Sequence, residues 1–185
     1  MGTPNEPSPA KLFLAIMHHP ATPTDDALDR FSDRFGPVDF SYGPVSFIFT
    51  DYYAAEMGAG LVKRYMTFER PIDPGALPEI KHYANGIEAG GAHDGRRVIN
   101  LDPGYMTNSK LVLASTKDFF HRLYLSNGIH GEITLAFRKG AWCWFSWTYP
   151  DYREPGFLSF LTRARASMVG AMRKNREDRD AEINP

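Results

Sequence analysis

Hydrophobic and polar positions alternate along the chain in blocks that predict both strands and helices. Residues 11–17, KLFLAIM, form an unbroken apolar run that is typical of a buried strand. Residues 24–35 instead place apolar side chains at i, i+3 and i+7, which predicts an amphipathic helix that ends at Gly36. A strand, a short helix and a further apolar run in this order indicate a βαβ-type start.

The remaining blocks extend this pattern over most of the chain. We expect strands at residues 45–49, 61–68 and 141–147, one or two helical turns at 50–58, and longer helices at 73–89 and 157–172. Pro78 removes a hydrogen bond near the start of its helix, so the first turn there is expected to be irregular. The elements together predict an α+β fold, in which a mixed, mostly antiparallel sheet carries about three longer helices packed on one face.

Residues 119–125 and 129–137 predict a β-hairpin around Ser126-Asn127-Gly128. A three-residue loop pairs Arg122 with Glu132 and Tyr124 with His130 and separates polar from apolar side chains, whereas a two-residue Asn127-Gly128 turn would pair Leu123 with Glu132 and mix them; we therefore expect the three-residue loop. In this register Leu123, Leu125, Ile129, Ile133, Leu135 and Phe137 face the core, and His121 lies among them. The Arg122–Glu132 ion pair is then worth under about 1 kcal/mol if it is exposed.

The stretch from Asn100 to Leu125 combines a buried run with a dense set of ionisable and aromatic polar side chains. We expect residues 98–101 to form a strand that runs into a type II turn at Asp102-Pro103-Gly104-Tyr105, because proline presets φ and glycine accepts a positive φ. The apolar run at residues 111–114 is either a buried strand or a short helix, and Thr107 as an N-cap slightly favours the helix.

Composition narrows the class of protein. The chain has 185 residues, of which 43% are hydrophobic, so residues 11–172 are expected to form one globular domain between disordered tails at 1–10 and 173–185. A net charge of −1 argues against a general nucleic-acid binder. No apolar run reaches the ~18 residues of a membrane span and no secretory signal is present, so we expect a cytoplasmic protein without membrane contact.

Polar and ionisable side chains gather in three tyrosine-bearing segments beside the apolar runs. Acids, bases and phenols next to a core suit proton transfer or anion binding. The candidates for catalytic proton transfer are Asp51, Asp102 and His121. The candidates for ligand binding are Tyr52, Lys63, Tyr105, Lys110, Lys117, Arg122, Tyr149 and Asp151. Each of them also has an ordinary explanation as a turn cap, a solvated charge or a hydrogen-bonded core residue.

No metal site and no cofactor is assigned from the sequence. The neighbouring His18 and His19 would point to opposite faces of a strand, which argues against a shared metal ion. A divalent metal held by Asp51, Glu56, Asp102 or His121 is a minor alternative. The sequence contains no G-x-x-x-x-G-K-[ST], G-x-G-x-x-G, H-E-x-x-H, G-x-S-x-G or C-x-x-C motif, so the classes that these motifs mark are not indicated.

Four segments together resemble a known family. They are KLFLAIM, FTDYYAAEMG, NLDPGYMTNSKLVLASTKDFFHRLYL and the WTYPDYR loop. The sequence is similar over residues 11–172 to domain-of-unknown-function family 4416, a group of small prokaryotic proteins. The resemblance implies that these loops belong together, and it assigns neither an activity nor a catalytic residue.

Two functions are compatible with these observations. The favoured one is binding or transformation of a small anionic ligand, nucleotide-like or phosphorylated, because the polar residues cluster in a few loops. The alternative is a non-catalytic adaptor that binds RNA or a protein partner through aromatic and basic surface residues. Neither the oligomeric state nor the existence of an enzymatic activity is set by the sequence.

Overall fold

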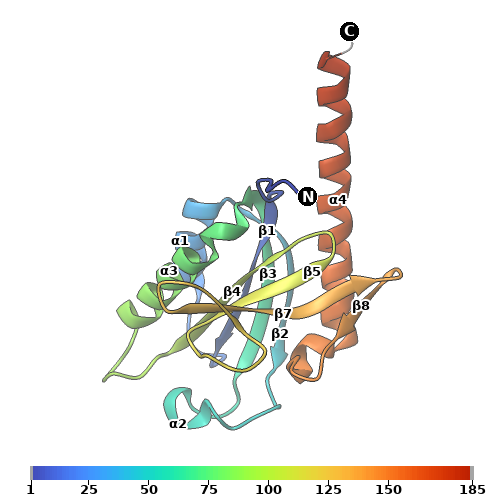
Figure 1. Ribbon diagram of the computed structural model, residues 1–185. Helices are drawn as coiled ribbons and strands as arrows, with labels where there is room; N and C mark the ends of the chain where they lie inside the picture. Colours follow the sequence, from blue (N-terminus) through green and yellow to red (C-terminus); the bar gives the residue numbers. More distant parts are fainter. Residues whose placement is uncertain (1, 184–185) are drawn as a thin grey trace.

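The computed structural model describes residues 2–183, without the side chains of residues 175, 176 and 179–183. The strands are β1 (Ala10–His18), β2 (Val38–Ser46), β3 (Val62–Ile72), β4 (Ile99–Met106), β5 (Lys110–Ser115), β6 (Leu123–Ser126), β7 (Ile129–Arg138) and β8 (Ala141–Trp144). The helices are α1 (Asp25–Phe35), α2 (Ala54–Met57), α3 (Leu77–Gly90) and α4 (Pro155–Ile183), with 3-10 turns at Pro74–Ala76 and Pro150–Arg153. These strands form one antiparallel sheet (Figure 1).

The first half of the chain has a ferredoxin-like arrangement. Its strands lie in the order β2-β3-β1-β4, α1 connects β1 to β2, and α3 connects β3 to β4. Strand β3 is antiparallel to both β1 and β2, so β1 and β2 run in the same direction with β3 between them. The βαβ-type start expected from the sequence therefore occurs in its split form.

The α+β class is confirmed, but the helices cover both faces of the sheet rather than one. Side chains of β1 alternate between the faces: Leu12, Leu14 and Ile16 pack beneath α1 and α3, and Phe13 and Ala15 pack beneath α4. Figure 1 shows α1 and α3 on one side of the sheet and α4 on the other. Because both faces of this strand are apolar, each of them needs a covering layer.

Strand β4 corrects the expected turn. Asp102-Pro103-Gly104-Tyr105 continues the strand and pairs with residues 12–15 of β1, while the hairpin to β5 turns at residues 107–109. A Cβ on Gly104 would lie well inside contact distance of the Val112 carbonyl oxygen. The glycine is therefore needed for the close approach of β5 and not for a turn. The run at 111–114 is strand β5, so the inclination towards a helix was wrong.

The hairpin of β6 and β7 has the predicted register over part of its length. Tyr124 pairs with His130, but a bulge at Leu125 brings Ser126 opposite Ile129. The connection is therefore a two-residue turn and not the expected three-residue loop, and Asn127 and Gly128 both have a positive φ, of 51° and 75°. The bulge lets the two-residue turn coexist with the predicted pairing of Tyr124 with His130.

The faces of this hairpin differ from the expectation. Leu123 and Ile133 are 76% and 42% exposed, whereas the pair of Arg122 and Glu132 is buried. Ile129 and Leu135 are buried as expected. The polar pair points inward because a polar cavity, and not the apolar core, lies beneath this part of the hairpin.

The two ends of the chain differ from one another. Residues 2–9 have no regular secondary structure. Residues 173–183, expected to be disordered, instead continue α4, whose last turns project from the body of the protein (Figure 1), and residues 184–185 lie outside the described part. This segment contains no proline or glycine, and six of its residues are Arg, Lys or Glu, which favour helix.

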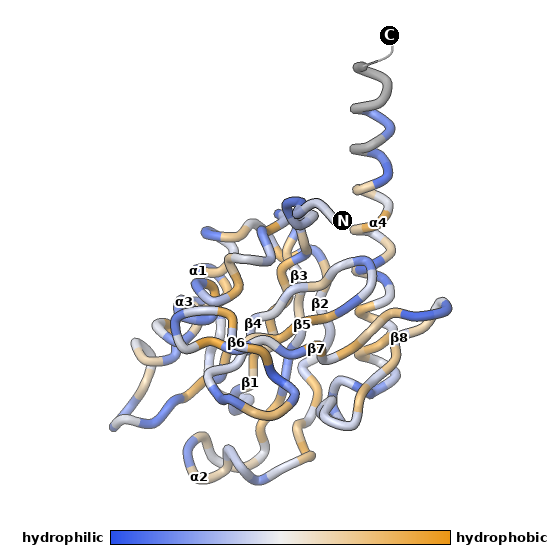
Figure 2. The backbone as a smooth tube through the Cα atoms, in the orientation of Figure 1, coloured by the Kyte–Doolittle hydropathy of each residue, from blue (hydrophilic) through white to orange (hydrophobic). Residues whose placement is uncertain are grey.

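Figure 2 shows the hydrophobic segments concentrated in the strands and the hydrophilic ones at loops and in the outer part of α4. No helix in residues 2–183 has the length and apolar character needed to cross a membrane.

Candidate functional site

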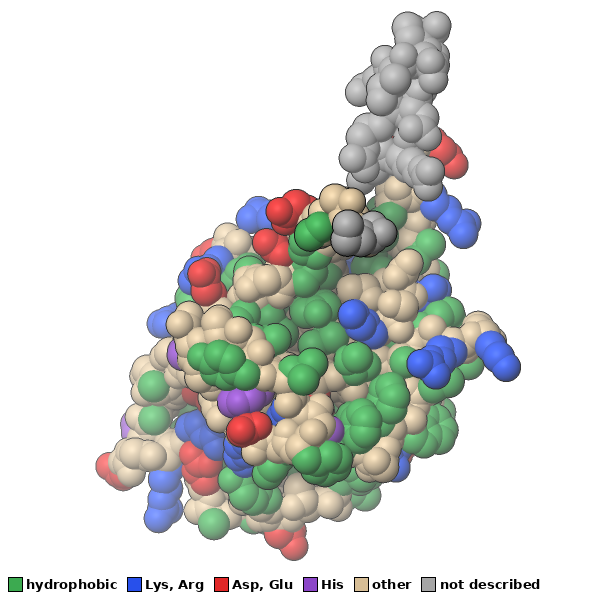
Figure 3. All heavy atoms as spheres, in the orientation of Figure 1, with side chains coloured by type: hydrophobic (Ala, Val, Ile, Leu, Met, Phe, Trp, Pro, Cys, Tyr) green, Lys and Arg blue, Asp and Glu red, His purple; other side chains and the backbone are tan. Residues whose placement is uncertain are grey.

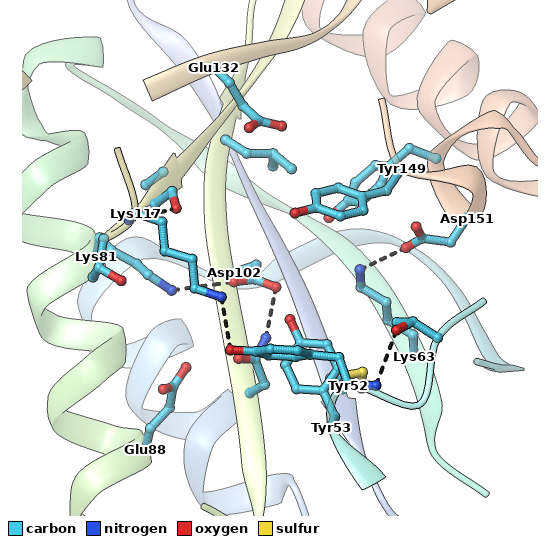
Figure 4. A pocket seen from close by; sticks show the side chains of 18 of the residues that line it. Tyr52, Tyr53, Lys63, Lys81, Glu88, Asp102, Lys117, Glu132, Tyr149 and Asp151 are labelled. Atoms are coloured by element: carbon cyan, nitrogen blue, oxygen red, sulfur yellow. Dashed lines mark hydrogen bonds and ion pairs between the residues drawn. The ribbon is translucent and has the colours of Figure 1, made fainter. Parts of the chain in front are cut away.

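A cavity of about 240 Å³ lies beside α3, between strands β3, β4, β5 and β7 and the loops that precede α2 and follow β8. Its walls contain Met17, Phe47, Thr50, Tyr52, Tyr53, Lys63, Lys81, Asn85, Glu88, Arg97, Asn100, Asp102, Leu113–Lys117, Arg122, Glu132, Tyr149, Asp151 and Tyr152. Figure 4 shows Asp102 near the middle of the labelled set, with Lys81 and Lys117 on one side of it and Lys63 with Asp151 on the other.

The cavity brings together most of the candidate residues chosen from the sequence. Asp102, Tyr52, Lys63, Lys117, Arg122, Tyr149 and Asp151 all line it. Four other candidates lie outside the lining, namely Asp51, Tyr105, Lys110 and His121. The loops that the sequence placed far apart therefore converge on one space, and the roles of their side chains stay predictions.

One wall is formed by an ion pair between Lys63 of β3 and Asp151 of the 3-10 turn after β8. The Lys63 Nζ atom lies 2.7 Å from Asp151 Oδ2, and the two side chains are only 8% and 5% exposed. Tyr65 donates a further hydrogen bond of 2.8 Å to the same oxygen. Burial, together with the charge of Asp151, raises the pKa of Tyr65 above its ordinary range, so its hydroxyl stays protonated and donates.

Asp102 is held at the floor by two donors. Lys81 Nζ lies 3.3 Å from Asp102 Oδ1 and also donates to the Leu101 carbonyl, and Asn100 Nδ2 donates to Asp102 Oδ2 over 2.7 Å. Burial alone would raise the pKa of Asp102. The charges of Lys81 and Lys63 and the two hydrogen bonds outweigh burial and lower the pKa below its ordinary value, so the carboxylate is ionised at neutral pH.

A third group of charges contains Arg97 and Glu88, which were missed at the level of sequence, together with Glu56. Arg97 binds Glu56 through Nε and Nη2, each over 2.7 Å, and its Nη1 lies 3.3 Å from Glu88 Oε2. Burial raises the pKa of Glu88, and the hydrogen bonds from Arg97 lower the pKa of Glu56. A signal did exist: Lys81, Asn85 and Glu88 follow i, i+4, i+7 spacing, which places a polar stripe along α3.

The fourth wall contains Arg122 and Glu132. Arg122 Nε donates to Glu132 Oε2 over 2.7 Å, and the side chains are 4% and 2% exposed. Arg122 Nη1 also donates to Ser115 Oγ at the end of β5. His121 Nε2 lies 3.1 Å from the same Glu132 oxygen, and the His121 ring stacks on Trp147. His121 thus lies in the turn before β6 and reaches the site through Glu132, and it is not a core residue of the strand.

Tyr52 and Lys117 form the most open part of the lining. Lys117 Nζ donates to the Tyr52 hydroxyl over 3.0 Å and also lies 4.5 Å from the centre of its ring. The hydrogen bond and the charge of Lys117 lower the pKa of Tyr52. Among the described residues, no carboxylate forms an ion pair with Lys117, unlike the other cations of the cavity.

Tyr105, Lys110 and Asp51 lie outside the lining, as His121 does. Tyr105 and Lys110 lie at the far ends of β4 and β5, because the expected turn at Asp102 is a continuous strand. Tyr105 packs on a small apolar cluster that includes Leu77. Asp51 is exposed beside Tyr52 without lining the cavity.

The described residues contain no cluster of three or more His, Cys, Asp or Glu side chains that is arranged to hold a metal ion. The carboxylates of the cavity are engaged instead by Lys and Arg side chains. The arrangement therefore offers hydrogen-bond donors, acceptors and phenols to a ligand.

The chain matches a family model over most of its length. The model is described as Domain of unknown function (DUF4416), and it matches residues 8–168, so the chain belongs to this family. The match spans every segment that lines the cavity. Comparisons with curated proteins and with solved structures returned no match.

Proposed function

We propose that the cavity binds or transforms a small anionic molecule, nucleotide-like or phosphorylated. The observation that carries the proposal is the set of charges around one space. Four of the five cationic side chains in the lining form ion pairs with carboxylates, and the one without such a partner among the described residues is Lys117 at the opening. An anionic group on a ligand would supply the missing partner.

The energetics of buried charge support a functional origin for this set. A buried ion pair is often no more stabilising than apolar side chains of similar volume, because desolvation offsets the attraction. The pairs Lys63–Asp151 and Arg122–Glu132 are almost fully buried. Charged groups that gather around a cavity at such cost are typical of binding and catalytic sites.

The test is a thermal-shift and calorimetric panel of inorganic phosphate, pyrophosphate, nucleoside monophosphates and sugar phosphates. A ligand at 100 times its Kd adds about 2.7 kcal/mol, or roughly 5–10 °C for a domain of this size. Lys117→Met should lose most of the shift. Lys110→Met is the matched control, since Lys110 lies outside the lining, and it should keep the shift.

The absence of a shift with every anion of the panel would contradict the proposal, and so would an equal shift in wild type and Lys117→Met. A cytoplasmic location belongs to the same proposal, because phosphorylated small molecules are metabolites of that compartment.

A protein partner is the second candidate, favoured by exposed apolar side chains beside the cavity. Phe120 is 92% exposed, and Leu123 and Tyr124 are 76% and 64% exposed. Figure 3 shows hydrophobic side chains distributed over the face that carries β6 and β7. On β8, Trp142 is buried, whereas Trp144 is 53% exposed. Binding that persists in Lys117→Met and is lost in Phe120→Ser would favour this second candidate; an RNA partner would instead show steep salt dependence.

A further inference from the structure

The cavity is graded from an open, cationic mouth to a buried floor. At the mouth, Tyr52 and Tyr149 are 62% and 50% exposed, and Lys117 is exposed as well. At the floor, the side chain of Lys81 is 7% exposed and Tyr152 is 1% exposed. The free charge and the buried hydrogen-bonding groups therefore lie at different depths, and one ligand would meet both.

Asp102 has acceptor capacity that the protein does not use. An ionised carboxylate offers about four lone-pair sites. Lys81 and Asn100 are the donors that the described residues supply, one to each oxygen. The Asp102 side chain is 29% exposed although its neighbour Lys81 is buried, so it is open towards the cavity. The unused lone pairs of the Asp102 carboxylate can accept a hydrogen bond from a donor on the ligand.

Tyr152 is a second group without a partner. This residue lines the cavity, it is buried, and its hydroxyl has no hydrogen-bond partner among the described residues. Leaving a buried hydroxyl unpaired costs free energy, so a partner from the contents of the cavity would be favoured. Asp102 and Tyr152 both line this cavity, so a single ligand can contact both groups.

We infer that the ligand has two ends of different chemistry: an anionic group at Lys117, and a hydroxylated, sugar-like portion whose hydroxyl groups donate to Asp102 and accept from Tyr152. This inference rests on the proposed function, since it specifies the ligand of the same cavity. A hydroxyl group both donates and accepts, so it matches the carboxylate and the phenol at once.

An amine is the other donor that a carboxylate commonly accepts, but the floor disfavours it. The Lys81 ammonium already lies 3.3 Å from Asp102, and the charge of Lys63 also acts on this carboxylate. A second ammonium would therefore stand beside like charges, which is unfavourable. A neutral hydroxyl avoids this repulsion.

Volume restricts the size of the ligand. A cavity of about 240 Å³ lies below the ~300–1,000 Å³ that drug-sized ligands occupy. The cavity therefore suits one sugar unit with its phosphate.

The experiment is isothermal titration calorimetry at fixed ionic strength with four probes: inorganic phosphate, ribose, ribose 5-phosphate and O-phosphoethanolamine. Wild type should bind ribose 5-phosphate about tenfold more tightly than inorganic phosphate, because a hydrogen bond to a charged group adds roughly this factor or more. Asp102→Asn should remove the higher affinity for ribose 5-phosphate without weakening the binding of inorganic phosphate. Asp51→Asn, an exposed aspartate outside the lining, is the matched control and should retain the advantage.

Tyr152→Phe is the second variant, and it guards against misfolding of Asp102→Asn. Because the hydroxyl has no partner among the described residues, its removal should not lower the melting temperature of the unliganded protein. The substitution should nevertheless weaken the binding of ribose 5-phosphate severalfold and leave the affinity for inorganic phosphate unchanged. A structural role alone would give the opposite result, a lower melting temperature with unchanged affinity, and that result would overturn the inference.

The outcomes separate the two proposals. If inorganic phosphate binds and ribose 5-phosphate binds no better, the inference fails and the proposed function stands. If O-phosphoethanolamine binds more tightly than inorganic phosphate and Asp102→Asn removes this difference, the donor to Asp102 is an amine and the inference is overturned. If no phosphate-bearing probe binds, both proposals fail together.

Discussion

Removing Arg122 should destabilise the protein far more than removal of a surface arginine. Arg122→Met leaves Glu132 as a carboxylate with 2% exposure and without its guanidinium partner. Breaking a buried pair in this way costs about 3–5 kcal/mol. Glu132 keeps contacts with His121 at 3.1 Å and Thr134 at 3.3 Å, so we expect the lower end, about 3 kcal/mol.

Urea denaturation followed by tryptophan fluorescence measures this loss in the free energy of unfolding. The melting temperature should fall by roughly 6–12 °C, at 2–4 °C per kcal/mol for a domain of this size. Arg30→Met is the matched control. Arg30 pairs with Asp26 over 3.0 Å on α1, but the side chains are 53% and 79% exposed, so this variant should lose under about 0.5 kcal/mol.

The double variant Arg122→Met/Glu132→Gln should recover more than about 1 kcal/mol of the lost stability, because it also removes the negative charge that the single variant leaves buried without a partner. If Arg122→Met costs no more than Arg30→Met, the pair is solvated as a surface pair is, and the inward orientation of this part of the hairpin would be refuted.

Three further predictions follow from particular contacts. Gly104→Ala should lose more than about 3 kcal/mol in stability, because its Cβ would meet the backbone of β5, whereas Gly86→Ala in α3, where a Cβ meets nothing, should gain up to about 1 kcal/mol. Tyr52 should form its phenolate at a lower pH than an ordinary tyrosine, and Lys117→Met should reverse this shift, as measured by ultraviolet difference titration against Tyr52→Phe. Glu56 has a lowered pKa, so its contribution to stability is present above the ordinary value of 4.5 and is lost as pH falls through the lowered value; Glu56→Gln should flatten the pH dependence of the melting temperature in that acidic range.

Each of these predictions has a result that would contradict it. Equal stability of the two glycine variants would argue against the close approach of β5. An unaltered Tyr52 titration in Lys117→Met would argue against their hydrogen bond, and a Glu56→Gln variant with the parent's acid dependence would argue against the pair with the arginine.

Where a local signal is sufficient, the sequence predicted the structure. The apolar run at 11–17 is a strand, and the helix at 24–35 ends at Gly36 as its period and end residues require. The start of α3 is a 3-10 turn before a helix with proline in its first turn, as expected from the missing N–H group of Pro78. Spacing, caps and prolines act over a few residues, so the sequence contains their effect in full.

The turn at Asp102 shows where a local signal misleads. Proline followed by glycine is typical of a turn. Here the glycine is required because strand β5 lies so close to its backbone that a Cβ atom would not fit. Whether these residues form a strand or a turn depends on the neighbouring strand, about which the dipeptide carries no information. The apolar run at 111–114 was ambiguous for the same reason, because a buried strand and a buried helix have the same composition.

For the site, residue type indicated the candidates and tertiary structure selected among them. Tyr52, Asp102 and Lys117 come from separate segments and meet at one cavity, whereas Tyr105 and Lys110 are carried away along continuous strands. Lys81, Glu88 and Arg97 were missed. Two of them lie on a polar stripe of α3 and the third in the loop that follows, and this stripe becomes part of a site only because β4 packs against it.

The sequence thus determined on its own the first strand, the longer helices, the α+β class and the ion pair of Arg122 with Glu132, while the strand expected at 45–49 lies at 38–46. Only the tertiary structure decided which layer covers each face of the sheet, and that a cavity and not the core lies beneath the hairpin. The physical reason is that periodicity tells which side chains share a face, while the surroundings of that face are built from residues that are distant along the chain.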